Sequence, residues 1–158
     1  MKRFLLCVLA GAGLLTAAAC ETKQMAMDPA AIVAKRQALM KDNGAAWAAI
    51  NDYLEKGQGS SADVIARAEA VADAAGGIPD LFPEGTSVDD MPGVSYAKAD
   101  IWANWSQFQS AANTLAAEAS KLAEVAKTGD KAAIKAQFDA FGGACGGCHK
   151  PFRIKKET

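Results

Sequence analysis

The chain has 158 residues, of which 51% are hydrophobic, and a formal net charge of −1. That length fits one domain with a single core. The nearly balanced charge argues against a nucleic-acid partner, and the sequence has no glycine-rich phosphate loop and no internal repeat.

The N-terminus has the layout of a bacterial export signal. Two basic residues precede an apolar run over residues 4–15, and an alanine stretch then leads to Cys20. The run is too short to span a membrane comfortably, so residues 1–19 are predicted to be a signal peptide and the mature chain periplasmic. Small residues directly before Cys20 predict lipoprotein processing, with lipidated Cys20 as a membrane tether. Ordinary cleavage is the alternative, because Ala17 stands where such signals usually carry leucine.

Residues 20–28 are predicted to be a linker, and a long helix follows them. Pro29 suits the first turn of a helix, and an alanine-rich pattern continues to about Lys56, where Gly57-Gln58-Gly59 ends it. One stripe of this helix carries larger apolar side chains and is expected to face the core. The residues of this stripe are Ile32, Leu39, Met40, Trp47, Ile50 and Leu54.

A second, shorter helix is predicted next, capped by Ser60 or Ser61 and with Asp63 in its first turn. Gly76-Gly77 ends it. Residues 76 to about 96 hold most of the prolines and several glycines, so they are predicted to form the one long loop of the chain. Loops of this length often cover a functional site.

Two further helices are predicted in the C-terminal half. The third is expected to begin at Ala97 and to end at Thr128-Gly129-Asp130, because its apolar residues alternate at spacings of four and three, as in a bundle seam. In the fourth, Pro151 lacks the amide that would bond to the carbonyl of Gly147, which favours an early helix end. The core-facing stripe of this last helix consists of Ile134, Phe138, Phe141, Cys145 and Cys148.

The pattern as a whole predicts an all-α fold. No segment alternates convincingly between apolar and polar residues, and the valines and isoleucines are scattered among alanines. Four helices joined mostly by short breaks indicate an antiparallel four-helix bundle over residues 29–158.

The C-terminal helix contains the sequence Cys145-Gly146-Gly147-Cys148-His149, and His149 is the only histidine of the chain. This is the spacing of covalent haem attachment. Because the two cysteines lie about one helical turn apart, both thiols can reach the vinyl groups on one edge of a porphyrin. His149 is then an axial ligand of the iron. One haem c is therefore predicted, bound through Cys145 and Cys148 inside the bundle.

Other functions of a Cys-x-x-Cys sequence are less consistent with this chain. A structural zinc site needs four ligands, and the other two cysteines, Cys7 and Cys20, lie in the N-terminal segment. A thioredoxin-like redox pair is expected at the start of a helix that follows a strand, whereas this motif ends a long helical pattern.

A helical pattern with the haem motif close to the C-terminus resembles the class II c-type cytochromes, which comprise the cytochrome c-prime group and its low-spin relatives. Three further matches carry the resemblance: Arg36-Gln37-Ala38-Leu39-Met40, Ile101-Trp102 and Phe152-Arg153. The resemblance implies a four-helix bundle that binds haem and often forms a homodimer through its first two helices. A peroxidase-like or other haem enzyme is a weaker alternative, and a protein that is not an enzyme is expected, because the mature chain has no distal histidine to serve as an acid or base.

The resemblance also implies that Met40 lies over the distal face of the haem. In low-spin members a methionine there binds the iron, which suits an electron-transfer protein with redox partner proteins. In high-spin members the position is apolar and the iron binds nitric oxide or carbon monoxide, so this function is the alternative. Arg153 and Arg36 are candidates for tuning the site from outside the iron's ligand set, although Arg153 could equally be a solvated cation near the helix end.

Overall fold

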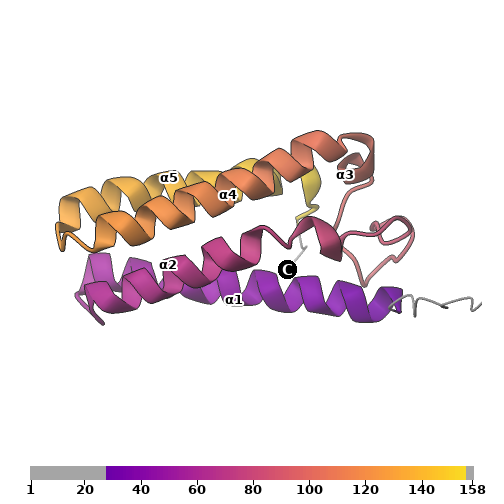
Figure 1. Cartoon of the computed structure of the whole chain (residues 1–158). Coiled ribbons are helices and arrows are strands. Elements are labelled where there is room, and N and C mark those ends of the chain that lie inside the picture. Colours follow the sequence, from indigo (N-terminus) through magenta and orange to yellow (C-terminus); the bar gives the residue numbers. More distant parts are fainter. Residues whose placement is uncertain (1–27, 156–158) are drawn as a thin grey trace, which may run out of the picture.

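The computed structural model describes residues 28–155, and this part of the chain is built from helices (Figure 1). One isolated antiparallel bridge joins Ala97 to Arg153. No helix among the described residues is both long enough and apolar enough to cross a membrane. The elements in chain order are α1 (Pro29–Lys56), α2 (Ser61–Ala75), the 3-10 helix η1 (Pro79–Leu81), α3 (Asp100–Ala103), α4 (Trp105–Ala126) and α5 (Lys131–Phe152).

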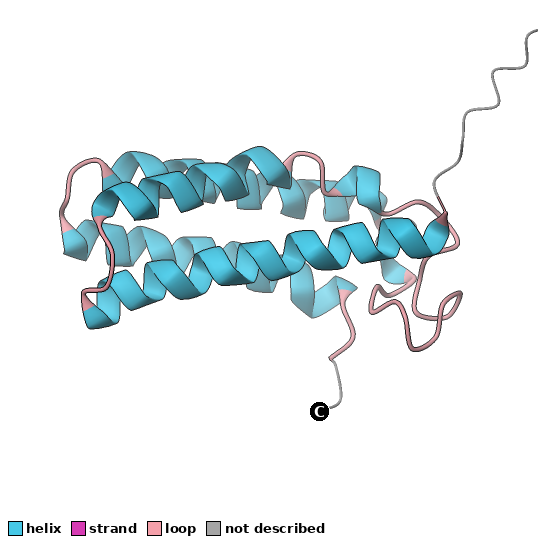
Figure 2. Cartoon of the chain, turned by 90° about the horizontal axis from the view of Figure 1, so that it is seen from below, coloured by secondary structure: helices cyan, strands magenta, loops and turns pink. Residues whose placement is uncertain are grey.

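The four long helices α1, α2, α4 and α5 form the predicted antiparallel bundle, which Figure 2 shows from below. The short α1–α2 and α4–α5 connections lie together at one end, which we call the turn end. The long segment 76–99, the start of α1 and the C-terminal part of α5 lie toward the other end, which we call the cavity end. The predicted signal peptide, Cys20 and nearly all of the predicted linker lie outside the described residues.

Local sequence signals end the helices at the turn end. Gly57 closes α1 with a left-handed φ of 68°, a conformation that glycine adopts without steric cost. The Ser60 hydroxyl accepts a hydrogen bond from the Asp63 amide, and the Asp63 carboxylate accepts one from the Ser60 amide, so α2 begins with a capping box. Asp130 caps α5 by accepting from the amides of Ala132 and Ala133. These ends agree with the sequence-based prediction.

The core runs between α2, α4 and α5 and continues to the cavity end. Small residues such as Ala68 and Ala119 are fully buried and let the helices approach closely, while Leu122 and Ile134 fill the space between them. Toward the cavity end aromatic rings take over, and Phe108 contacts the rings of Phe82, Trp105 and Phe152. A cavity adjoins these rings, and Phe82, Phe108 and Phe152 line it.

Three details differ from the sequence-based prediction. The third helix does not run unbroken from Ala97, because the short α3 ends at Ala103 and α4 begins at Trp105. Asn104 between them has a φ of −126° and a ψ of 44°, which are not helical. Pro151 does not end α5 early, since the helix continues through Phe152 with only the Gly147 carbonyl deprived of its amide partner. Trp47 was expected to face the core but is 41% exposed.

Candidate haem-binding site

Two adjoining cavities of about 380 and 280 Å³ lie between the first half of α1 and the C-terminal part of α5. Met40, Ile78, Cys148 and His149 line both of them. Segments far apart in sequence therefore meet around one space, which brings together the predicted site residues Met40 and His149. Apolar side chains form most of the walls, as expected for a site that binds a large flat ligand.

Helix α5 supplies one wall with the thiols of Cys145 and Cys148 and the imidazole of His149. Their positions follow from the helical stripe, because Phe141 and Ala144 on the same helix are buried in the core. Both cysteines lie half-buried, and neither forms a disulfide within the part of the chain that the structure describes. Among the described residues no three His, Cys, Asp or Glu side chains converge on a point that could hold a metal ion. The three groups are thus spread along the wall rather than gathered as in a zinc site.

Burial raises the pKa of both thiols. For Cys148, burial and then the neighbouring Cys145 raise the pKa to about 11, and burial is the main cause of the raised pKa of Cys145. A redox-active Cys-x-x-Cys pair needs the opposite shift, because its reactive form is the thiolate. The environment of the two thiols therefore favours uncharged groups in an apolar wall.

The pKa of His149 is lowered, first by desolvation and then by the positive charge of Arg153. Both effects disfavour the imidazolium form. A metal-binding imidazole must be neutral on its ligating nitrogen, so this shift suits an axial ligand.

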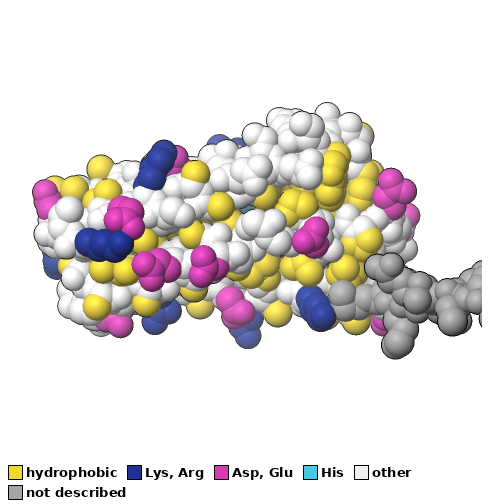
Figure 3. All heavy atoms as spheres, in the orientation of Figure 1, with side chains coloured by type: hydrophobic (Ala, Val, Ile, Leu, Met, Phe, Trp, Pro, Cys, Tyr) yellow, Lys and Arg dark blue, Asp and Glu magenta, His cyan; other side chains and the backbone are white. Residues whose placement is uncertain are grey.

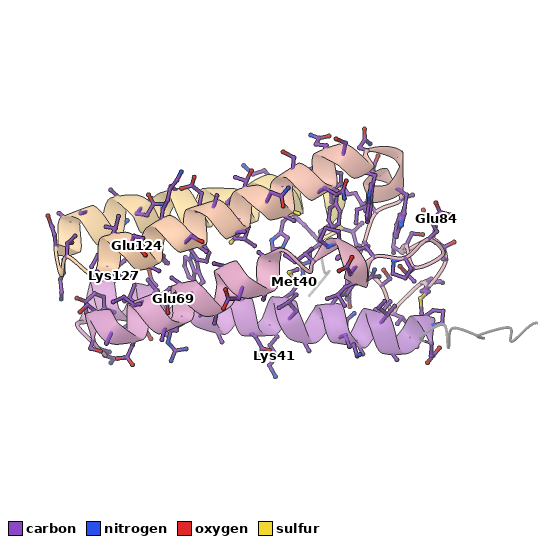
Figure 4. All side chains as sticks on the ribbon, viewed as in Figure 1. Met40, Lys41, Glu69, Glu84, Glu124 and Lys127 are labelled. Atoms are coloured by element: carbon purple, nitrogen blue, oxygen red, sulfur yellow. The ribbon has the colours of Figure 1, made fainter. Side chains whose placement is uncertain are left out.

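Helix α1 supplies the facing wall. Met40 is partly buried, and its side chain points from α1 toward the interior of the bundle (Figure 4). One helical turn later, Asn43 lines the smaller cavity, and its Nδ2 atom is buried with no hydrogen-bond partner among the described residues. Trp47 lines the same cavity and stacks at a tilt on Phe138, with 5.3 Å between ring centroids. Its exposed surface thus belongs to a side chain at the cavity rim.

Arg36 is almost fully buried, at 4% exposure, and lines the larger cavity. Its guanidinium donates hydrogen bonds to the Thr86 hydroxyl (3.1 Å), the Thr86 carbonyl (2.5 Å) and the Ser95 hydroxyl (2.7 Å), and it lies 4.6 Å from the Phe82 ring centroid. All of these partners are neutral, and burial lowers the Arg36 pKa to about 10, so the group remains a cation at neutral pH.

This arrangement gives Arg36 a role that the sequence analysis missed. Arg36 fastens the long loop to α1, and next to it Gln37 donates a hydrogen bond of 2.7 Å to the Val94 carbonyl. The helical spacing of Arg36 and Met40 could have indicated a shared face, because they are four residues apart. Nothing local to Thr86 and Ser95 identifies them as partners, since they lie 50 and 59 residues from Arg36.

Arg153 also lines the larger cavity, and it is exposed. The Arg153 amide donates a hydrogen bond to the His149 carbonyl at the end of α5. Arg153 also forms an antiparallel bridge with Ala97. Arg153 thus borders the cavity and is also exposed to solvent, so its influence on a bound haem stays a prediction. After desolvation, the positive charge of Arg153 is the second cause that lowers the pKa of His149.

The residues around the cavities fit a haem. Two thiols on one wall, an imidazole on the same helix and a thioether on the facing helix are the donor types that haem attachment and axial ligation require. The buried and unpartnered Asn43 amide also borders this space. A polar atom of this kind is rare in a protein interior and usually has a partner when the site is filled.

Comparison with known proteins agrees with this fit. The sequence profile of the family described as Cytochrome C' matches residues 31–153. A cytochrome c' of Rhodospirillum rubrum is 36% identical over 155 residues, which cover 97% of this chain and 99% of that protein. A cytochrome c-556 of Agrobacterium tumefaciens (strain II Chrys) is 33% identical over 126 residues, covering 78% and 98%. A solved cytochrome c' with a ligand-controlled dimer dissociation superposes with a TM-score of 0.75 at 30% identity, covering 82% and 99%.

Proposed function

The chain belongs to the cytochrome c' family and carries one covalently bound haem c, and from this premise we propose that it is an exported electron-transfer protein. In this proposal Cys145 and Cys148 would attach the haem, and His149 and Met40 would bind its iron. The bound haem supplies an iron that exchanges one electron between its ferrous and ferric forms. The chain is not assigned an enzymatic reaction, because His149 is its only histidine and none remains to act as a distal acid or base.

The assignment on α5 rests on the spacing and the surroundings of its three groups. Two neutral thiols one turn apart in an apolar wall suit thioether bonds to the porphyrin edge. A lowered His149 pKa keeps the imidazole neutral for binding to iron.

The observation that carries the electron-transfer proposal is the place of Met40, which lines both cavities opposite His149. A thioether is a soft ligand for haem iron and favours the ferrous form. Two protein ligands would hold the iron in the same environment before and after electron transfer. The other methionine among the described residues, Met91, lies in the loop beyond η1.

The second candidate is a five-coordinate, high-spin protein that binds nitric oxide or carbon monoxide. One observation and one general property favour it. The matched relatives include proteins named cytochrome c' alongside proteins named cytochrome c-556. A flexible methionine, in addition, commonly fills space in a core without binding anything. In that case Met40 would only cover the iron, and a small gas would take the sixth position.

Optical and electron paramagnetic spectra of the ferric and ferrous protein separate the two functions. With Met40 bound, the ferric protein is low-spin and shows a weak near-infrared methionine-to-iron band. It then binds carbon monoxide slowly, because the thioether must first dissociate. Met40→Ala should become high-spin, bind gas rapidly and lose reduction potential. A wild-type protein that is already high-spin and binds gas at once would contradict electron transfer and support the second candidate.

We further propose that residues 1–19 direct the chain to the periplasm and are then removed. Lipidation of Cys20 is the proposed tether, and the mass of the N-terminal peptide of the mature protein tests it directly. A homodimer through α1 and α2 is also proposed, since small exposed residues such as Ala45 and Ala48 on α1 and Ala66 and Ala70 on α2 would allow close helix contact. Sedimentation of the protein with and without carbon monoxide tests the dimer.

A further inference from the structure

Five basic residues line the larger cavity or lie within two residues of residues that line it. Lys41 and Arg153 line the cavity, and Lys41 points away from the bundle into solvent (Figure 4). Lys150 and Lys155 lie three residues before and two residues after Arg153, and both are exposed. Lys98 is half-buried beside them. We call Lys41, Lys98, Lys150, Arg153 and Lys155 the mouth cluster.

Backbone pairing brings the last members of the mouth cluster together. The Lys98 amide donates a hydrogen bond of 2.9 Å to the Phe152 carbonyl, and the Ile154 amide donates one of 3.0 Å to the Tyr96 carbonyl. Segments 96–98 and 152–154 thus run side by side in opposite directions. Arg153 is extended, so Arg153 and Lys155 point to the same side of this short ribbon.

No member of the mouth cluster forms an ion pair within residues 28–155. The acidic neighbours in sequence do not neutralise it: Asp42, next to Lys41, lines a different groove between α1 and α2, and Asp100 lies in the first turn of α3. The cluster therefore has unpaired positive charge at the cavity opening.

Most lysines at the turn end behave differently, although Lys131 there lies over the ring of Tyr53, 4.9 Å from its centroid. Four of them form ion pairs of 2.6–2.9 Å with acidic residues three or four positions away on the same helix. On the face shown in Figure 3, acidic and basic side chains accordingly lie next to one another toward the turn end. The paired lysines are Lys56, Lys121, Lys127 and Lys135.

From this contrast we propose that the mouth cluster is the docking surface for a redox partner protein that presents an acidic face. The inference rests on the proposed electron-transfer function, because it places the partner at the cavity in which the haem is held. A group of unpaired cations on an otherwise acidic chain orients an acidic partner before contact and speeds its association, while like-charged proteins are repelled. The positive charge of a paired lysine is largely cancelled by its neighbouring carboxylate. The paired lysines of the turn end therefore attract an acidic partner less strongly than the mouth cluster does.

The first test maps the surface without any electron transfer. Hexacyanochromate(III), a paramagnetic and redox-inert trianion, is added to the ferrous holoprotein, and the broadening of backbone amide signals is recorded. We expect broadening around residues 96–98 and 150–155 and near Lys41, and none around Lys56, Lys127 or Lys135. Broadening spread evenly over both ends would overturn the proposal.

The second test measures rates with charged oxidants. One electron passes from the reduced protein to hexacyanoferrate(III), which becomes hexacyanoferrate(II) with no bond or proton change. Lys98→Glu with Lys150→Glu and Lys155→Glu should lower this rate about tenfold at low salt and reduce its salt dependence. The matched control, Lys56→Glu with Lys127→Glu and Lys135→Glu, changes the net charge equally and should lower the rate less than twofold. Equal effects of the two variants would contradict a local docking site.

Three further measurements separate the outcomes. The corresponding glutamine variants should give the same order of effects, which keeps the test valid if a charge-reversed protein folds poorly. Tris(phenanthroline)cobalt(III), a cation, should react faster with the Lys98, Lys150 and Lys155 variant than with wild type. Cosedimentation of the holoprotein with phosphatidylglycerol vesicles that depends on these three lysines would assign the surface to a membrane and overturn the proposal. A high-spin spectrum would instead contradict the electron-transfer function itself, while the anion map would still report the surface.

Discussion

The two ends of the bundle are built in different ways. The turn end has local interactions, namely a capping box, a left-handed glycine and ion pairs within single helices, around a core of Leu122, Ile134 and buried alanines. The cavity end depends on contacts between distant segments. The buried Arg36 of α1 donates hydrogen bonds to the long loop, and the end of α5, which continues past Pro151, pairs with the segment around Ala97. From this difference we expect the stability of the turn end to depend less on the enclosed group than that of the cavity end does.

Removing the attachment thiols is expected to have the largest effect, because it takes the enclosed group away from the cavity end. In Cys145→Ser with Cys148→Ser we expect no covalent haem and a loss of stability on the order of 3–5 kcal/mol, comparable with emptying a large core site. Amide hydrogen exchange should become fast at the cavity end and stay slow around Leu122 and Ile134. Haem staining of a denaturing gel and exchange mass spectrometry measure the two effects. A variant that keeps haem after denaturation would show that the attachment residues are assigned wrongly.

The reverse experiment weakens the turn end alone. Ile134 is fully buried in α5, more than two helical turns from Cys145. Ile134→Ala should lower the free energy of unfolding by about 2–5 kcal/mol, because it removes buried methyl groups and leaves a cavity. The optical spectrum of the folded protein should remain that of wild type. Chemical denaturation measures the first effect, and an altered spectrum would mean that the two ends are more tightly coupled than their contacts indicate.

The same contrast explains what the sequence could predict. At the turn end, the boundaries near Lys56, Ser60 and Asp130 were predicted correctly, because each depends on residues within a few positions. The antiparallel bundle also followed, since the periodicity of the apolar residues is a local signal over several turns.

At the cavity end the sequence was a poorer guide. The break at Asn104 and the exposure of Trp47 were not predicted, because both depend on how the long loop and α5 pack against other helices. Arg36 was placed near the site, but its partners Thr86 and Ser95 are set by tertiary structure. The haem motif was found because its residues are adjacent in sequence. Met40 came from resemblance, and it remains a prediction as an iron ligand.

Loss of the buried Arg36 is expected to loosen the long loop of the cavity end and to leave the turn end unchanged. Arg36→Met keeps much of the side-chain volume but removes three hydrogen bonds to the loop. We expect a loss of about 1.5–3 kcal/mol, the range for hydrogen bonds that involve a charged group. Amide exchange should accelerate in residues 84–95 and not at the turn end. Thr86→Ser, which retains the hydroxyl, is the control and should leave exchange nearly unchanged.

The smallest expected effect tests whether the turn end is held by local caps. Ser60→Ala removes the hydroxyl from the capping box of α2 and should cost about 1 kcal/mol at neutral pH. The partner carboxylate, Asp63, has a lowered pKa because it accepts hydrogen bonds from the Ser60 hydroxyl and amide.

The lowered Asp63 pKa gives the prediction a pH signature. A carboxyl whose pKa is lower in the folded state stabilises the fold above its unfolded pKa, and this contribution is lost as the pH falls through the folded value. The difference in stability between wild type and Ser60→Ala should therefore be constant above about pH 5 and shrink below pH 4. Thermal unfolding of both proteins between pH 3 and pH 7 measures it. Because the cap acts only on α2, the haem spectrum should be identical in the two proteins at every pH at which both are folded. A spectral change in Ser60→Ala would mean that a cap at the turn end influences the site, and the independence of the two ends would have to be abandoned.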